Sequence, residues 1–355
     1  MRAMVDAAEM LSGLARTEEV EGALVLSVYL DLRPQETGGR PALRSGEIVL
    51  RDRLREIERT LGHRGPAIES FKQDAGRLQQ YLAGEVAPST QGLAAFACSA
   101  TGLFDVIETG VAFDNQVSAG RTARLYQLAR LVDEYETAVT ALVDTNSARL
   151  FVTRLGQLEE RGGIDDDPVH YQKRSTGGWS EARYQRHIEK HQSDFLQAIA
   201  AEVAELVNRE GATRLVLVGN EVAIPRLRGF LPSSLSAAVE ERRLDMRADR
   251  NEVQQEVDPI LRRLEEEDSR AAADRLVAAV QSGDLGASGV EHVRSALERG
   301  QVDVLVLEDS PELDKSARNE LARLAAQTSA TVEVVEGHDG LTALGGVGAL
   351  LRYNL

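Results

Sequence analysis

Two kinds of apolar segment alternate along this 355-residue chain, and their alternation restricts it to a layered α/β fold. Short runs rich in apolar and β-branched residues predict buried strands. The clearest of these runs are Ala23–Leu32, Gly92–Cys98, Leu103–Thr109, Thr137–Val143, Ala148–Leu155, Leu215–Val218, Val302–Leu307 and Thr331–Val335. Between them apolar residues recur at helical spacing. The longest such helices are expected over residues 43–62, 67–83, 180–208 and 251–281.

Two segments are expected to interrupt these regular elements. Pro259 lies inside the segment 251–281, where its missing N–H and its ring predict a kink or a break in the helix. The segment Arg161–Pro168 contains two glycines and three aspartates, which favours an acidic loop.

The length of the chain predicts several domains, because one hydrophobic core rarely serves more than about 250–300 residues. The α/β patterns divide it into an N-terminal α/β domain over residues 1–122, a central domain over 123–268 and a C-terminal domain over 269–355. All three are acidic, and the net charge is −16. Bulk charge therefore does not attract the protein to nucleic acid, and any such contact must be local.

One segment of the central domain differs from this acidic background. Residues 171–191 carry five basic residues, Lys173, Arg174, Arg183, Arg186 and Lys190, against Glu181 and Glu189, which gives +3 (5 − 2). Gly177 and Gly178 form the expected tip of a loop, because glycine adopts backbone conformations closed to other residues. Trp179, the only tryptophan, follows them, and Ser180 is expected to cap the next helix. Such a loop suits a narrow cavity lined with phosphate, although a solvated helix face would have the same charges.

The sequence motifs of other catalytic and ligand-binding sites are absent from this chain. The chain contains neither the phosphate-binding pattern Gly-x4-Gly-Lys-Ser/Thr nor the hydrolase pattern Gly-x-Ser-x-Gly. His187 and His191 share one helix face, but Ile188 stands where a zinc protease needs glutamate. Cys98 is the one cysteine and lies in an apolar run. We therefore expect no cofactor and no metal. No run of about 18 apolar residues occurs, so we expect a cytoplasmic protein without membrane contact.

The segment Lys173–His187, with the long helix that follows it, resembles the central domain of archaeo-eukaryotic class-1 peptide-chain release factors. Residues 285–307 are similar to the third domain of release factors and of the pelota family, and Gly345–Tyr353 is similar to the ending of the bacterial branch of that superfamily. The resemblance covers about residues 123–355. It implies a ribonuclease-H-like central domain and a C-terminal α/β domain that resembles kink-turn-binding ribosomal proteins.

The resemblance also implies a site. In the family a Gly-Gly-Gln loop enters the peptidyl-transferase centre of the ribosome and positions the water that hydrolyses peptidyl-tRNA. Gly177 and Gly178 match this motif, and Trp179 stands in place of the glutamine. We expect these three residues at the reacting ester. The expected contacts to ribosomal RNA come from Lys173, Arg174, Ser180, Arg183, Arg186, His187 and Lys190.

Three functions are consistent with these features. The first is rescue of stalled ribosomes by hydrolysis of peptidyl-tRNA. The second is non-catalytic occupation of the ribosomal A site during hibernation or stress, with Trp179 stacked on a base. The third is a protein–protein adaptor whose C-terminal domain binds a partner. For the first two, the expected partners are ribosomal RNA and peptidyl-tRNA, and a translational GTPase is a further candidate.

Overall fold

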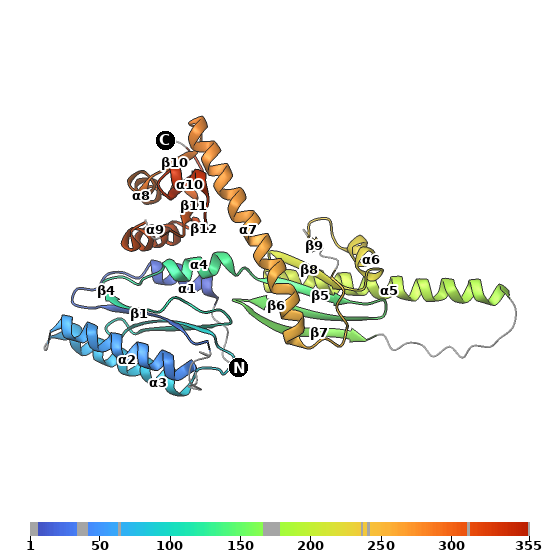
Figure 1. Ribbon diagram of the computed structural model, residues 1–355, viewed down its shortest axis with the longest axis horizontal. Coiled ribbons are helices and arrows are strands. Elements are labelled where there is room, and N and C mark those ends of the chain that lie inside the picture. Colours follow the sequence, from blue (N-terminus) through green and yellow to red (C-terminus); the bar gives the residue numbers. More distant parts are fainter. Residues whose placement is uncertain are drawn as a thin grey trace. The chain divides into compact units, whose positions relative to one another are not determined.

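The computed structural model describes residues 6–33, 42–62, 65–165, 178–235, 237–239, 242–310 and 313–353. It forms two compact units. Unit 1 combines Met1–Glu134 with Glu265–Leu355, and unit 2 is Tyr135–Leu264. Each unit consists of mixed α/β layers (Figure 1), so the expected multidomain α/β class is confirmed. The division at residues 122 and 268 stays a prediction.

The first half of unit 1 is an antiparallel sheet covered by helices. Its strands lie in the order β3-β2-β1-β4. Their bounds are β1 Val25–Asp31, β2 Gly92–Cys98, β3 Leu103–Thr109 and β4 Gln116–Gly120. Two long helices, α2 (Ala42–Leu61) and α3 (Pro66–Gly84), cover one face with apolar side chains such as Leu50, Leu54 and Phe71. Strands β1, β2 and β3 and both helices fall where the apolar runs and the helical spacing predicted them, whereas β4 was not expected.

The opposite face of this sheet packs under α1 (Ala7–Ala15) and α4 (Tyr126–Glu134), as Figure 1 shows. Tyr29 is fully buried there, in edge-to-face contact with Phe96 at a centroid distance of 5.7 Å. Its hydroxyl donates to the carbonyl of Arg124. Burial raises the pKa of Tyr29 far above its ordinary value, so the hydroxyl remains a donor.

The second half of unit 1 is a mixed sheet in the order β10-β13-β11-β12. Its strands are β10 Gly286–Ser288, β11 Val302–Glu308, β12 Thr331–Val335 and β13 Val347–Leu351. Its helices are α8 Val290–Glu298, α9 Lys315–Thr328, α10 Asp339–Ala343 and the C-terminal section of α7 (Arg250–Ser282). Ala273 and Leu276 of α7 pack with Val306, Val335 and Leu341 in a small core.

Asp309, which follows β11, joins the two halves of unit 1. Its carboxylate accepts from Arg318 of α9 at 2.9 Å, from Arg130 of α4 at 2.6 Å and from the Tyr126 hydroxyl at 3.2 Å. Arg318 is 6% exposed, so its charge needs this partner. Segments far apart in the sequence thereby form one unit.

Unit 2 is a five-stranded sheet in the order β7-β6-β5-β8-β9. The first three strands in sequence form an antiparallel meander, and β8 and β9 extend it in parallel with β5. The bounds are β5 Ala138–Val143, β6 Ser147–Arg154, β7 Gln157–Asp165, β8 Arg214–Gly219 and β9 Ala237–Val239. Helices α5 (Gly178–Glu210) and α6 (Ala223–Phe230) pack on one face, and the first part of α7 packs on the other.

The structure corrects two expectations in this unit. Residues 161–165 belong to β7 and not to a loop, because Gly162 and Gly163 pair with Leu150 and Arg149 of β6 across a register shift. Helix α7 continues through Pro259 without a break. Val257 and Ile260 on either side of the proline are buried against the sheet, and this burial compensates for the lost hydrogen bond.

Three carboxylates of unit 1 meet where the chain enters and leaves that unit. Oxygens of Asp133 (α4), Glu265 (α7) and Glu333 (β12) lie within 4.8 Å of one another. Asp133 accepts from the Val334 amide at 2.7 Å. Burial, and then the charges of Glu333 and Glu265, raise the pKa of Asp133 to about 9. Asp133 is therefore protonated at neutral pH.

This raised pKa predicts the pH dependence of stability. Above about pH 4 an aspartate in the unfolded chain has lost its proton, whereas folded Asp133 keeps it up to about pH 9. Stability should therefore fall as pH rises between these values, by at most about 1.4 kcal/mol per pH unit from this group. Asp133→Asn should flatten the slope, because an amide oxygen still accepts from Val334. Urea unfolding at several pH values measures it.

The matched control for that experiment is Asp303→Asn, which alters an exposed carboxylate paired with Arg352 at 3.3 Å. It should leave the slope unchanged. Equal slopes in wild type and Asp133→Asn would contradict the protonated state of Asp133.

Candidate nucleic-acid interface on helix α5

Helix α5 has two sections with different environments. From Phe195 onward it carries the apolar stripe that packs on the sheet of unit 2. The buried members of this stripe are Phe195, Leu196, Ile199, Ala200, Val203, Leu206 and Val207. Four of them, Phe195, Ile199, Val203 and Leu206, follow the helical spacing that the sequence predicted.

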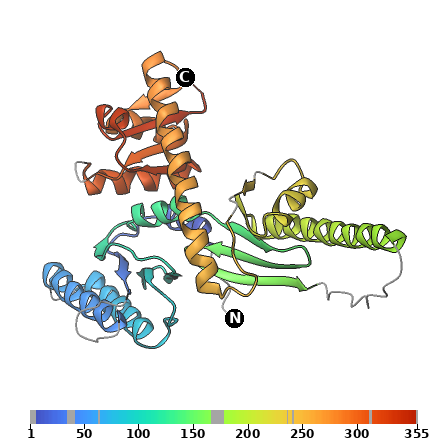
Figure 2. The ribbon, with the colours of Figure 1, turned by 45° about the vertical axis from the view of Figure 1, so that its right-hand side comes forward.

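The N-terminal section of α5 has no such packing. None of the side chains from Gln185 to Asp194 is buried, and most are exposed. Figures 1 and 2 show this section extending beyond the edge of the sheet of unit 2. From Gly178 to Asp194 a helix rises about 25 Å. The second section thus anchors an arm that, from Gln185 to Asp194, presents mostly polar side chains to solvent.

The exposed section places its basic and imidazole groups on neighbouring stripes. Arg186 and Lys190 are one turn apart, as are His187 and His191. The two imidazole rings are edge to face, with centroids 5.6 Å apart. At about 100° per residue these four positions span about 140° of the helix circumference, and Glu189 lies outside that arc. Three predicted RNA-contacting residues, Arg186, His187 and Lys190, are therefore exposed together.

The other predicted site residues lie at or before the start of this helix. Lys173, Arg174 and Gly177 fall outside the residues that the structure describes. The backbone of positions 178–183, which include Trp179 and Arg183, is helical. Ser180 was expected to cap α5, but the helix begins at Gly178. Gly178, Trp179 and Ser180 therefore form the first turn, whose N–H groups have no acceptor within the helix.

The first turn of α5 is suited to binding an anion. Unpaired N–H groups and the helix dipole make an N-terminus attractive to anions. The sequence predicted a loop with Gly178 at its tip and a helix that begins at residue 180. The helix-forming residues that follow Gly178 were the signal for an earlier helix start. The candidate interface is therefore the N-terminal end of a helix with basic residues along its side.

Among the described residues, His187 and His191 have no third ligand close enough to form a metal site with them. The group in the described part of the chain that could hold a cation is the carboxylate cluster of Asp133, Glu265 and Glu333 in unit 1. Sequence analysis missed it because its members come from three distant segments, and no local spacing connects them. Within the described ranges no helix is long and apolar enough to span a bilayer.

The comparison with family models identifies the domain that carries the arm. Residues 124–262 match the model for bacterial archaeo-eukaryotic release factor family 10. The chain carries a release-factor domain. The suspected superfamily is thereby confirmed, and the matched region includes the whole of α5 and all five strands of its sheet. No curated protein matches the chain.

Several solved structures are similar at a distance. The archaeal translation termination factor aRF1 is 18% identical, with 98% of this chain and 97% of that chain covered and a TM-score of 0.27. Pelota of Archaeoglobus fulgidus is 19% identical over 74% of this chain and 79% of its own, with a TM-score of 0.35. A ribosome-bound model of archaeal Pelota and ABCE1 is 15% identical over 100% and 96%, with a TM-score of 0.45.

The exposed basic stripe predicts salt-sensitive binding to RNA. Replacing Arg186 and Lys190 together with glutamate should weaken binding of the protein to ribosomes by at least about tenfold in low salt, because each substitution replaces an attraction to phosphate with a repulsion. The affinity of this variant should also depend less steeply on salt concentration. Co-sedimentation over a salt series measures both effects.

The matched control replaces Arg228 and Arg247 together with glutamate, because both are exposed residues of the same unit outside α5 and the change in net charge is equal. It should bind as wild type does. If both variants lose affinity equally, net charge and not the stripe on α5 governs binding.

Proposed function

We propose that this protein binds the ribosomal A site and inserts the N-terminal end of α5, with Gly177, Gly178 and Trp179, into the peptidyl-transferase centre. There it hydrolyses peptidyl-tRNA and so rescues stalled ribosomes in the cytoplasm. The observation that carries the proposal is the exposed N-terminal section of α5, which presents Arg186 and Lys190 on a release-factor domain of an acidic chain. A translational GTPase that delivers the protein belongs to the same proposal.

The charge pattern supports contact with RNA at one place only. A net charge of −16 repels a phosphate-rich surface. Positive residues on the arm, which include Arg186 and Lys190, concentrate the attraction there. Phosphate contacts of this kind orient a protein without reading sequence. The acidic body would then be held away from RNA while the arm enters a narrow cavity.

The first turn of α5 supplies the chemistry. Water attacks the carbonyl carbon of the ester that joins the peptide to the tRNA, and negative charge develops on the carbonyl oxygen. Backbone N–H groups at positions 178–180 can stabilise that charge, because they have no partner within the helix. The bond to the ribose oxygen then breaks, and that oxygen takes the proton of the attacking water. A glutamine side chain is not required for these steps.

Substituting Trp179 by proline or by alanine distinguishes the role of its backbone N–H from the role of its side chain. Proline is tolerated in the first turn of a helix and removes one N–H, whereas alanine keeps it. With ribosomes stalled on labelled peptidyl-tRNA, wild type should release peptide. Trp179→Pro should reduce the rate by about 100-fold or more, the usual cost of losing one oxyanion donor. Trp179→Ala should retain most of the rate.

The outcome of this experiment decides between two functions. If wild type binds ribosomes and never releases peptide, hydrolysis is wrong. The alternative is then a non-catalytic hibernation or stress factor that blocks the A site. Trp179 favours this alternative, because an indole that stacks on a base contributes about 1–3 kcal/mol and performs no acid–base chemistry. In that case Trp179→Ala should weaken binding to empty ribosomes.

A further inference from the structure

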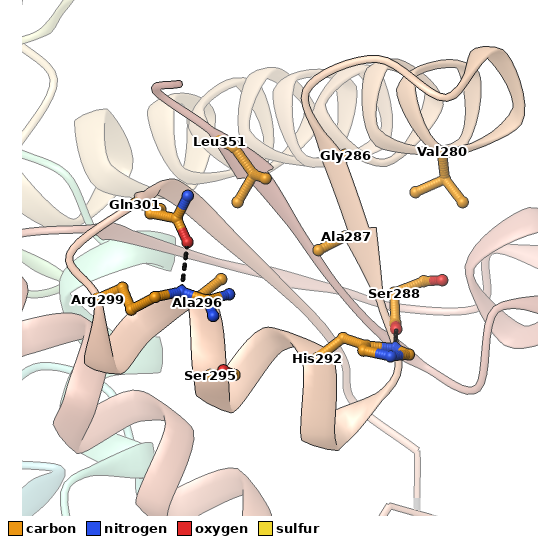
Figure 3. A pocket seen from close by; sticks show the side chains of 10 residues that line it. All are labelled: Val280, Gly286, Ala287, Ser288, His292, Ser295, Ala296, Arg299, Gln301 and Leu351. Carbon is orange, nitrogen blue, oxygen red and sulfur yellow. Dashed lines mark hydrogen bonds between the residues drawn. The ribbon is translucent and has the colours of Figure 1, made fainter. Parts of the chain in front are cut away.

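A hollow lies on the C-terminal half of unit 1, far along the sequence from the arm on α5. It has a volume of about 630 Å³ and lies between β10, the face of α8, the end of α7 and β13 (Figure 3). Gly286 brings β10 close to α7, because a Cβ at this position would lie 2.7 Å from the amide nitrogen of Val280. Cavities of this size hold small organic molecules in many proteins.

The lining of the hollow is apolar on one side and polar at both ends. Val280, Ala287, Ala296 and Leu351 provide the apolar surface. The polar side chains are Ser288, His292, Ser295, Arg299 and Gln301. His292 and Arg299 lie seven residues apart on α8 and its C-terminal extension, which is about 10 Å along the helix axis. A ligand that reaches both must be of comparable length.

Arg299 is held so that it can bind an anion. Its Nε donates to Oε1 of Gln301 at 2.7 Å, and Nε2 of Gln301 donates to the carbonyl of Tyr353 at 3.4 Å. Gln301 is 4% exposed, so this side chain is fixed. No carboxylate among the described residues pairs with Arg299. Its two terminal amino groups can therefore form the paired hydrogen bonds that a phosphate or carboxylate accepts.

Other arginines of the same sheet region differ in this respect. Arg294 is paired with Glu291 at 2.6 Å and with Glu320 at 3.1 Å, and Arg352 is paired with Asp303. Acidic residues outnumber basic ones by 57 to 41 in this chain, so most of its surface repels an anion. The residues that line the hollow include no acid. Its only permanent charge is that of Arg299.

His292 provides a directed polar group at the other end. Its Nδ1 lies 3.3 Å from the carbonyl oxygen of Ser288. A carbonyl only accepts, so Nδ1 carries the proton and Nε2 of the neutral ring is an acceptor. Helix α8 begins beside it, after Gly289, without a side-chain cap. This end of the hollow can therefore hydrogen-bond the polar edge of a ligand.

We propose that the hollow binds a small organic phosphate with a flat ring, of the size of a nucleoside monophosphate. The phosphate pairs with Arg299, the ring lies on the apolar surface formed by Ala287, Ala296 and Leu351, and His292 contacts the far edge of the ring. The proposal is independent of the activity assigned to α5. It gives the C-terminal half of unit 1 a ligand of its own.

The test is isothermal titration of the full-length protein with adenosine, guanosine, cytidine and uridine 5′-monophosphates. At least one should bind saturably to one site per chain. Inorganic phosphate and the free nucleoside should each bind at least about tenfold more weakly, because each retains only one part of the contact surface. Arg299→Gln should weaken binding by about tenfold or more, since it removes a charge-assisted contact. Ser295→Trp should abolish binding by filling the hollow.

Arg352→Gln is the control, because Arg352 carries the same charge and does not line the hollow. It should bind as wild type does, and circular dichroism should show equal melting temperatures for all variants. Absence of binding for all four nucleotides would overturn the proposal. So would binding that Ser295→Trp leaves intact, binding in which inorganic phosphate matches the nucleotide, or binding of RNA oligonucleotides alone.

Discussion

The packing of the second section of α5 against the sheet of unit 2 determines what the rest of that helix can do. Phe195, Ile199 and Val203 fix the helix on β5, β6 and β8. Because a helix is continuous, the anchored section fixes the direction of the first section over about 25 Å, and no side chain from Gln185 to Asp194 is buried. The exposed side chains of this section, Arg186 and Lys190 among them, are accessible to a partner, which is the physical reason to assign it a binding role.

In unit 1, side-chain contacts join two segments that lie far apart in the sequence. Asp309 neutralises the buried Arg318 and also binds Arg130, so the first and last segments share a partly buried charge network. Close by, the carboxylates of Asp133, Glu265 and Glu333 require a proton to coexist. Both groups lie near residues 134 and 265, where the chain passes from one unit to the other.

Sequence patterns predicted much of the fold and part of the site. Strands such as Gly92–Cys98 and Ala138–Val143 match the structure because buried strands are continuous apolar runs. The helix over 251–281 was predicted, but of the kink or break expected at Pro259 the break does not occur, because the packing of Val257 and Ile260 keeps the helix continuous. Polar strands such as β4 and β7 carry little apolar signal and were missed. Contacts between distant segments, such as those of Asp133 with Glu265 and of Asp309 with Arg130, have no local pattern at all.

The central claim is that the N-terminal end of α5 reaches the peptidyl-transferase centre. An electron cryo-microscopy map of the protein on ribosomes that carry peptidyl-tRNA tests it most directly. The account predicts density for α5 in the A site, with the backbone at Gly178 and Trp179 within hydrogen-bond distance of the ester carbonyl. Density that leaves this end of α5 in solvent, or places the protein elsewhere on the ribosome, would contradict it.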